Sequence, residues 1–124
     1  MSYLTSDQLM AKLRKEIKEI SVHELARKMD NGEDVTLVDI RGLEEWDQGN
    51  IKGSVHISRG FLELQIERHA PNRDQPIAVI CAGGVRSLLG ARDLEALGYT
   101  NVASVAGGLT VGRTAATILW SREL

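Results

Sequence analysis

The sequence predicts an α/β fold with a mostly parallel sheet of about five short strands. The first observation is that apolar runs of strand length alternate with stretches of helical spacing along the whole chain. The second is that 35–41 and 77–80 are nearly continuous β-rich runs, which is typical of strands buried on both faces. The third is that glycine-containing turns separate strands from helices, as βαβ units require. These observations favour a central sheet flanked by helices on both faces.

The composition fits one domain and gives no sign of a nucleic-acid partner. A chain of 124 residues is long enough for a single core and too short for two. Its net charge of −2 supplies no basic surface for nucleic acid or anionic lipid. No apolar segment has membrane-spanning length, and we expect a cytoplasmic location. A single cysteine excludes an internal disulfide and a CxxC zinc site, so we expect no metal and no cofactor.

The N-terminal part predicts two helices. Residues 1–19 hold an amphipathic helix, capped at Thr5 or Ser6, that we expect to pack on a single domain formed by 20–124. A second helix follows Ser21, which forms a capping-box pattern with Glu24. The apolar positions of the first helix recur at helical spacing: Leu9, Met10, Leu13 and Ile17.

The remaining elements follow in the same alternation. A short helical turn is predicted near 43–46, a strand at 54–57, a helix at 61–68, and a surface turn with both prolines at 70–76. After the strand at 77–80, a helix runs from Arg86 to a glycine stop at Gly98. A strand at 102–105, a Gly-Gly turn and a final helix over 109–119 complete the prediction.

The stretch from Cys81 to Ser87 is the candidate site, because Cys81 follows a buried strand and precedes a helix. Ligands of parallel α/β sheets bind at this edge. The thiolate is the reactive form of cysteine, and a helix N-terminus favours it. Gly83 and Gly84 let the backbone curl its N–H groups around the sulfur, and Arg86 is placed to close the far side of this cradle. Ser87 adds a hydroxyl as a cap or as a hydrogen bond to the loop.

These residues resemble the active-site loop of rhodanese-type sulfurtransferases, in which four residues separate a cysteine from an arginine. Further motifs match that family in order and spacing. These are Val38-Asp39-Ile40-Arg41, Glu45-Trp46, Gly49, Ile51-Lys52-Gly53-Ser54, His56-Ile57, Leu97-Gly98-Tyr99 and Ala106-Gly107-Gly108.

The resemblance implies a rhodanese-like fold of five parallel strands and a carrier mechanism. Cys81 would be the nucleophile that takes a sulfane sulfur and holds it as a persulfide. The N–H groups from Ala82 through Gly83, Gly84 and Val85 to Arg86 would hold the outer sulfur, with Ser87 beside them. Arg86 would assist an anionic donor or support the loop.

Two charged residues, Asp39 and Arg41, lie at the end of the buried strand at 35–41. Buried charges are usually paired or placed at a site. Asp39 and Arg41 are best explained as an ion pair beneath the loop, with Arg41 a second candidate for contact with the anion. Asp39 and Glu45 are expected as supporting residues. The implied partners are a small anionic donor such as thiosulfate and a protein that donates or accepts sulfur.

Two other functions stay open. A phosphatase or arsenate reductase of related fold resembles a cysteine with five residues before the arginine, a wider cradle than the four residues present here. A rhodanese-like carrier or regulatory module without catalysis is the other alternative. If Arg41, Arg59 and Arg86 converge on the loop mouth, their charge favours an anionic donor. The segment after Gly108 departs from the family, because Gly112 stands where a tryptophan is typical, and Trp120 is a candidate to fill the gap.

Overall fold

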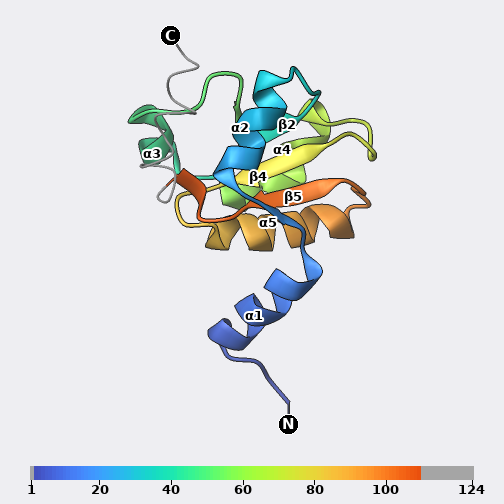
Figure 1. The fold of residues 1–124 in the computed structure, drawn as a ribbon. Helices are drawn as coiled ribbons and strands as arrows, with labels where there is room; N and C mark the ends of the chain where they lie inside the picture. Colours follow the sequence, from blue (N-terminus) through green and yellow to red (C-terminus); the bar gives the residue numbers. More distant parts are fainter. Residues whose placement is uncertain (1, 110–124) are drawn as a thin grey trace.

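The computed structural model describes residues 2–109 and has a five-stranded, fully parallel sheet at its centre (Figure 1). The strand order is β1-β5-β4-β2-β3, which places β4 in the middle of the sheet. The strands are β1 (Glu19–Ile20), β2 (Thr36–Asp39), β3 (Val55–His56), β4 (Ile77–Ile80) and β5 (Val102–Val105). The predicted class, sheet and strand number are confirmed.

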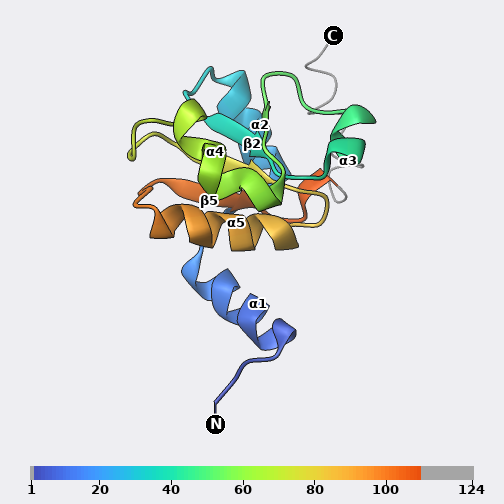
Figure 2. The same cartoon turned by 180° about the vertical axis from the view of Figure 1, so that it is seen from behind.

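Helices cover both faces of this sheet, as Figures 1 and 2 show together. Helix α2 lies on one face, while α4 and α5 lie on the other. Helix α3 lies at the edge of the sheet where the strands end. The helices are α1 (Ser6–Glu16), α2 (Val22–Asp30), α3 (Leu43–Asp47), α4 (Leu62–His69) and α5 (Val85–Ala96), and a 3₁₀ turn η1 (Arg59–Phe61) precedes α4.

Alternate residues of the strands build two apolar layers, since successive side chains of a strand point to opposite faces. In the layer toward α4 and α5, Val38 and Val79 are fully buried. In the layer toward α2, Leu37 and Ile80 are buried. Burial on both faces explains why the sequence of these strands is continuously apolar rather than alternating.

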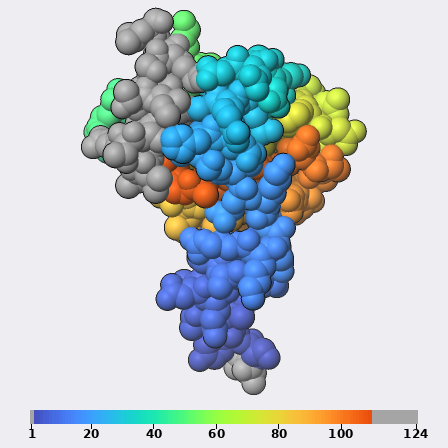
Figure 3. Space-filling view, in the orientation of Figure 1, coloured from blue at the N-terminus to red at the C-terminus, as the bar shows by residue number. Residues whose placement is uncertain are grey.

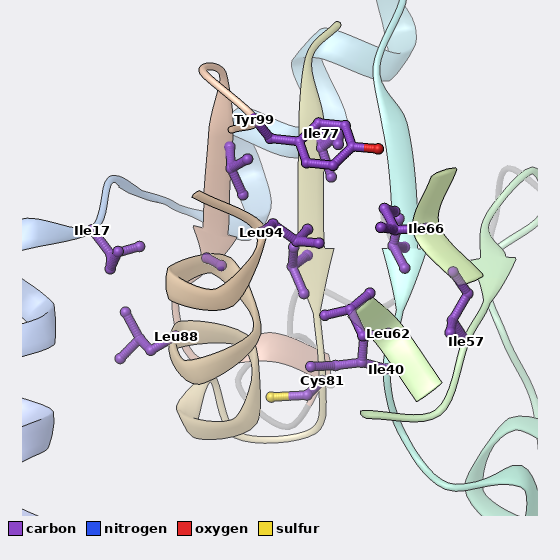
Figure 4. Packing of buried hydrophobic residues seen from close by; sticks show 14 of the residues in the cluster. Ile17, Ile40, Ile57, Leu62, Ile66, Ile77, Cys81, Leu88, Leu94 and Tyr99 are labelled. Atoms are coloured by element: carbon purple, nitrogen blue, oxygen red, sulfur yellow. The ribbon is translucent and has the colours of Figure 1, made fainter. Parts of the chain in front are cut away.

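Helix α1 stands out from the body of the molecule and contacts it through one end (Figure 3). Leu13 and Ile17 are buried in the apolar layer that contains Leu88 of α5, and Figure 4 shows Ile17 beside Leu88. The opposite end of the segment is exposed, with Leu4 54% accessible. No helix among residues 2–109 is both long enough and apolar enough to span a bilayer.

Local signals predicted the helix ends well. Thr5 caps α1: its side chain accepts a hydrogen bond from the N–H of Gln8, and the Gln8 side chain accepts one from the N–H of Thr5. Ser21 accepts from the N–H of Glu24, which supplies the Ser21 half of the predicted capping box. The predicted final helix, apart from its first residue, and Trp120 lie outside the described residues.

Candidate active site

Cys81 lies directly after β4, the central strand, at the sheet edge from which α5 begins (Figure 4). Its side chain belongs to the apolar layer under α5 and the residue is only 1% exposed. The four residues from Ala82 to Val85 carry the chain around the sulfur, and Gly83 and Val85 are exposed. The sulfur therefore lies at the floor of a short loop between strand and helix.

Three groups of the loop and of α5 surround the sulfur. The backbone N–H of Gly84 donates to Cys81 Sγ over 3.2 Å, and the N–H of Ser87 donates over 3.4 Å. The Ser87 hydroxyl lies 3.5 Å from the same sulfur. Both N–H groups belong to the start of α5, where helical N–H groups have no partner within the helix. The two N–H donors stabilise negative charge on sulfur.

Two glycines make the close packing of this loop possible. Gly84 has φ of 85°, and a β-carbon there would lie 2.8 Å from the N of Gly107. Gly108 has φ of 53°, and a β-carbon there would lie 2.1 Å from the carbonyl oxygen of Cys81. That carbonyl accepts a hydrogen bond of 3.0 Å from the N–H of Leu109. The backbone that follows β5 thus packs closely against the cysteine loop and donates a hydrogen bond to it.

Arg86 forms a two-pronged ion pair with Glu45 of α3. Its Nη1 lies 2.8 Å from Oε1, and its Nη2 lies 3.0 Å from Oε2. The hydrogen bond from Arg86, together with one from the N–H of Gly42, lowers the pKa of Glu45 to about 2, although burial opposes the shift. The same hydrogen bond raises the pKa of Arg86, and the charges of Cys81 and Asp39 act in the same direction. The arginine that the sequence predicted as an anion contact is held by a carboxylate.

Asp39 and Arg41 form a buried ion pair beneath α3. The Arg41 Nε lies 3.1 Å from each carboxylate oxygen of Asp39, and Nη2 lies 2.9 Å from Oδ2. Nη2 also donates to the carbonyl of Gly49 over 2.8 Å, and Nη1 donates to that of Glu45 over 3.4 Å. All three guanidinium nitrogens have protein partners, and Arg41 is 8% exposed. This geometry suits a structural pair that anchors the segment before and after α3.

Carboxylates pair with each of the three arginines whose convergence on the loop mouth would favour an anionic donor, which are Arg41, Arg59 and Arg86. Arg59 pairs with Glu63 over 2.8 Å and also with Asp93, two turns into α5. His56 stacks on Trp46 with ring centroids 4.9 Å apart, and its Nε2 bonds to the Arg41 carbonyl oxygen over 2.8 Å. The charges of these arginines are balanced by partners within residues 2–109, so they do not give the loop mouth the excess positive charge that would favour an anionic donor.

Sequence reasoning missed two residues that contact this site. Ser104 of β5 lies with its Oγ 2.7 Å from the Oγ of Ser87, and both serines are fully buried. Gly108 leaves no room for a β-carbon beside the Cys81 carbonyl oxygen, whereas the sequence suggested only a turn there. A polar residue in the middle of the apolar strand at 102–105 was the available signal for Ser104.

The fold and the loop define a class: a parallel α/β domain with a buried cysteine in an N–H cradle after its central strand. The family model of the Rhodanese-like domain matches residues 21–114. The chain belongs to this family, which confirms the resemblance seen in its motifs.

Curated relatives carry names from sulfur chemistry. A "Putative sulfurtransferase YtwF" of Bacillus subtilis is 35% identical over 94 residues, which cover 76% of this chain and 88% of that protein. A "Thiosulfate sulfurtransferase GlpE" of Pseudoalteromonas translucida is 32% identical, with 79% of this chain and 90% of that protein covered. A "Putative sulfur carrier protein YrkF" of Bacillus subtilis is 33% identical over 75% of this chain, but the match spans about half (49%) of that protein.

Solved structures show the same fold. A protein from Rhodopseudomonas palustris, described as a possible tyrosine phosphatase, is 28% identical with a TM-score of 0.81, and 94% of each chain is covered. A thiosulfate sulfurtransferase from Pseudomonas aeruginosa is 26% identical with a TM-score of 0.76, covering 87% of this chain and 20% of that one.

Proposed function

We propose that this protein is a sulfurtransferase that moves a sulfane sulfur, from thiosulfate or from a protein persulfide, to a nucleophilic acceptor through a persulfide on Cys81. The observation that carries the proposal is the Cys81 sulfur at the floor of a four-residue loop, with N–H donors from Gly84 and Ser87. The names of the curated relatives support it as sulfur chemistry.

The chemistry needs one sulfur nucleophile and a site for one further sulfur. The Cys81 thiolate attacks the outer sulfur of thiosulfate, the sulfur–sulfur bond of the donor breaks, and sulfite leaves with the bonding electron pair. A nucleophile such as cyanide then attacks the outer sulfur of the persulfide, forms thiocyanate and returns the thiolate. The N–H groups from Ala82 to Arg86 are the groups that we propose hold the outer sulfur.

Thiosulfate-to-cyanide transfer by the whole chain tests this proposal. We expect thiocyanate formation by the wild type and none above background by Cys81→Ala, because the chain has one cysteine. Wild-type activity no higher than that of the variant would defeat the thiosulfate assignment. A small-molecule or protein persulfide donor should then be tried in the same assay.

Intact mass measurement tests the carrier step separately. After incubation with thiosulfate and removal of excess donor, the wild type should gain the mass of one sulfur atom, and cyanide or dithiothreitol should remove it. Cys81→Ser is the matched control, since it keeps a small polar side chain at the same position. An adduct that persists in Cys81→Ser would show that Cys81 is not the carrier, and the absence of any adduct with every donor would favour a binding module.

A phosphatase is the second candidate, because one structural neighbour is described as a possible tyrosine phosphatase. Here the loop has four residues between Cys81 and Arg86, and the Arg86 terminal nitrogens are occupied by Glu45. Both features disfavour a cradle for a tetrahedral phosphate. Hydrolysis of p-nitrophenyl phosphate that is lost in Cys81→Ser would establish this alternative.

A further inference from the structure

Behind the Cys81 sulfur, two buried hydroxyls form a short chain with it. The Cys81 Sγ is placed to donate to the Ser87 Oγ over 3.5 Å, and the Ser87 Oγ lies 2.7 Å from the Oγ of Ser104, where either hydroxyl can donate. Both serines are fully buried, Ser87 in the first turn of α5 and Ser104 in β5. Within residues 2–109, the Ser104 side chain has no hydrogen-bond partner other than Ser87. These three polar atoms form a hydrogen-bonded series, called here the hydroxyl chain, that runs from the sheet to the sulfur.

The number of hydrogens available shows which protonation state of the sulfur the hydroxyl chain suits. Each serine hydroxyl brings one hydrogen, and a thiol brings a third. The hydroxyl chain has two contacts, one between Cys81 Sγ and Ser87 Oγ and one between the two serine oxygens, and each contact holds one hydrogen. With a thiol, Sγ donates to Ser87 and Ser87 donates to Ser104, so the Ser104 hydrogen is left buried without an acceptor among these atoms, which is unfavourable. A thiolate can only accept, so the bond between Sγ and Ser87 reverses: Ser87 donates to sulfur, Ser104 donates to Ser87, and two hydrogens fill two contacts.

We propose that Ser104 is a positioning residue for the Cys81 sulfur, because its hydroxyl directs the Ser87 hydroxyl to donate to the sulfur. The Ser104 hydrogen occupies the contact between the two serines, so the Ser87 hydrogen points to Sγ. Donation from Ser104 also polarises the Ser87 O–H and strengthens its bond to a charged acceptor. Ser104 itself does not touch the sulfur in this arrangement and acts through Ser87.

Other charged groups near the sulfur are held by partners that the two serines do not contact. Arg86 comes from α5 and is paired with Glu45 of α3. Asp39 comes from β2 and is paired with Arg41. Replacing Ser104 leaves these two ion pairs in place, so a change in the titration of the sulfur can be assigned to the hydroxyl chain.

A pH titration of the thiolate tests the inference. The ultraviolet absorbance of the thiolate is followed against pH, with Cys81→Ser as the baseline, since the chain has one cysteine. Loss of the direct donor in Ser87→Ala should move the midpoint of the transition up by about one unit. Ser104→Ala should move it in the same direction by a few tenths of a unit, as expected for the loss of polarisation.

The double variant distinguishes positioning from an independent effect. If Ser104 acts through Ser87, Ser87→Ala with Ser104→Ala should move the midpoint no further than Ser87→Ala alone. Ser54→Ala is the matched control, because the Ser54 hydroxyl is partly buried and bonds to the Ile51 carbonyl away from the loop. It should leave the midpoint unchanged. An unchanged midpoint in Ser104→Ala, or additive shifts in the double variant, would overturn the inference.

This inference rests on the proposed role of Cys81 as the reactive sulfur, but its test uses no sulfur donor. If the shifts appear and no sulfur transfer is found, the positioning role stands and the proposed function fails. If sulfur transfer is found and the shifts do not appear, the proposed function stands and the positioning role fails. Urea unfolding of each variant shows whether loss of folding, rather than loss of the hydroxyl chain, causes a shift.

Discussion

At the scale of single residues, Gly108 shows how little room the cysteine loop leaves. Its φ of 53° disfavours any β-carbon, and a β-carbon would also lie 2.1 Å from the Cys81 carbonyl oxygen. Gly32 provides the comparison, because it has a similar φ of 69° but no atom within 4 Å of the place that a β-carbon would take. Alanine at these two glycines therefore separates the cost of backbone conformation from the cost of steric crowding.

We expect Gly32→Ala to lower the free energy of unfolding by about 1 kcal/mol through backbone strain alone. Gly108→Ala should cost about 3 kcal/mol, because overpacking adds to the strain. It should also lower the rate of sulfur loading, since the loop must move away from the backbone after β5. Urea unfolding and intact mass measure the two effects. Equal losses of stability in both variants would show that crowding at Gly108 is relieved without cost.

Arg86 is predicted to assist an anionic donor or to support the loop, and its pair with Glu45 suits the second role. Arg86→Ala should slow sulfur loading from thiosulfate about tenfold, because the start of α5, whose N–H groups bond to the sulfur, loses its bond to Glu45 of α3. Its effect on unfolding should stay below about 1 kcal/mol, because the Arg86 side chain is 38% exposed. Arg59→Ala is the control, since Arg59 is also paired with carboxylates but faces α4 and the middle of α5.

Intact mass against time gives the loading rates of the two arginine variants. Arg59→Ala should load sulfur at the wild-type rate. Slow loading in both variants, or slow loading that parallels lost stability, would make Arg86 a structural residue only.

At the scale of elements, the bridge between Glu45 and Arg86 ties α3 to the start of α5. The pKa of Glu45 is lowered to about 2, so the folded protein binds the proton of this group less tightly than the unfolded chain does. A lowered carboxyl pKa contributes stability above the unfolded value of about 4.5, and that contribution is lost as the pH falls toward 2.

We expect the difference in unfolding free energy between wild type and Glu45→Gln to be largest above pH ~4.5 and to shrink toward pH ~2. Both side chains are more than a third exposed, so solvent screening limits the full difference to about 1 kcal/mol. Urea unfolding at a series of pH values measures it. A difference that stays constant across this window would mean that the bridge does not contribute to stability.

Helix α1 is attached by few residues, which makes its contribution easy to isolate. Leu13 is 2% exposed, and Leu13→Ala should lower the unfolding free energy by about 2–4 kcal/mol. Leu4 is 54% exposed, and the same substitution there should cost less than about 0.5 kcal/mol. Urea unfolding compares the two. A small loss in Leu13→Ala would show that the rest of the domain is stable without the packing of α1.

The elements were largely predictable from sequence because local signals agreed with burial. The strand at Ile77–Ile80 and the helix cap at Thr5 follow from apolar continuity and from capping chemistry. Contacts between distant segments were not predictable in this way. The pairing of Arg86 with Glu45 spans 41 positions of sequence, and no local pattern specifies which carboxylate an arginine meets.

At the scale of the whole molecule, the parallel sheet brings the ends of β2, β4 and β5 to one edge. Asp39, Cys81 and the two glycines after β5 therefore lie at the same edge, although each belongs to a different part of the sequence. The motif order made this edge recognisable as a site. Ser104 was not recognised, because its role depends on facing Ser87 across the layer between sheet and helix, and only the register of β5 determines that.

The single cysteine has a consequence for how a sulfur atom would leave. These 124 residues contain no second thiol that could attack a persulfide on Cys81, so the persulfide cannot be converted to a disulfide within them. Under the proposed function, every turnover must end on a nucleophile outside these 124 residues that attacks the outer sulfur at the loop mouth. Under that function, the thiols or small nucleophiles that surround the protein would decide where the sulfur goes.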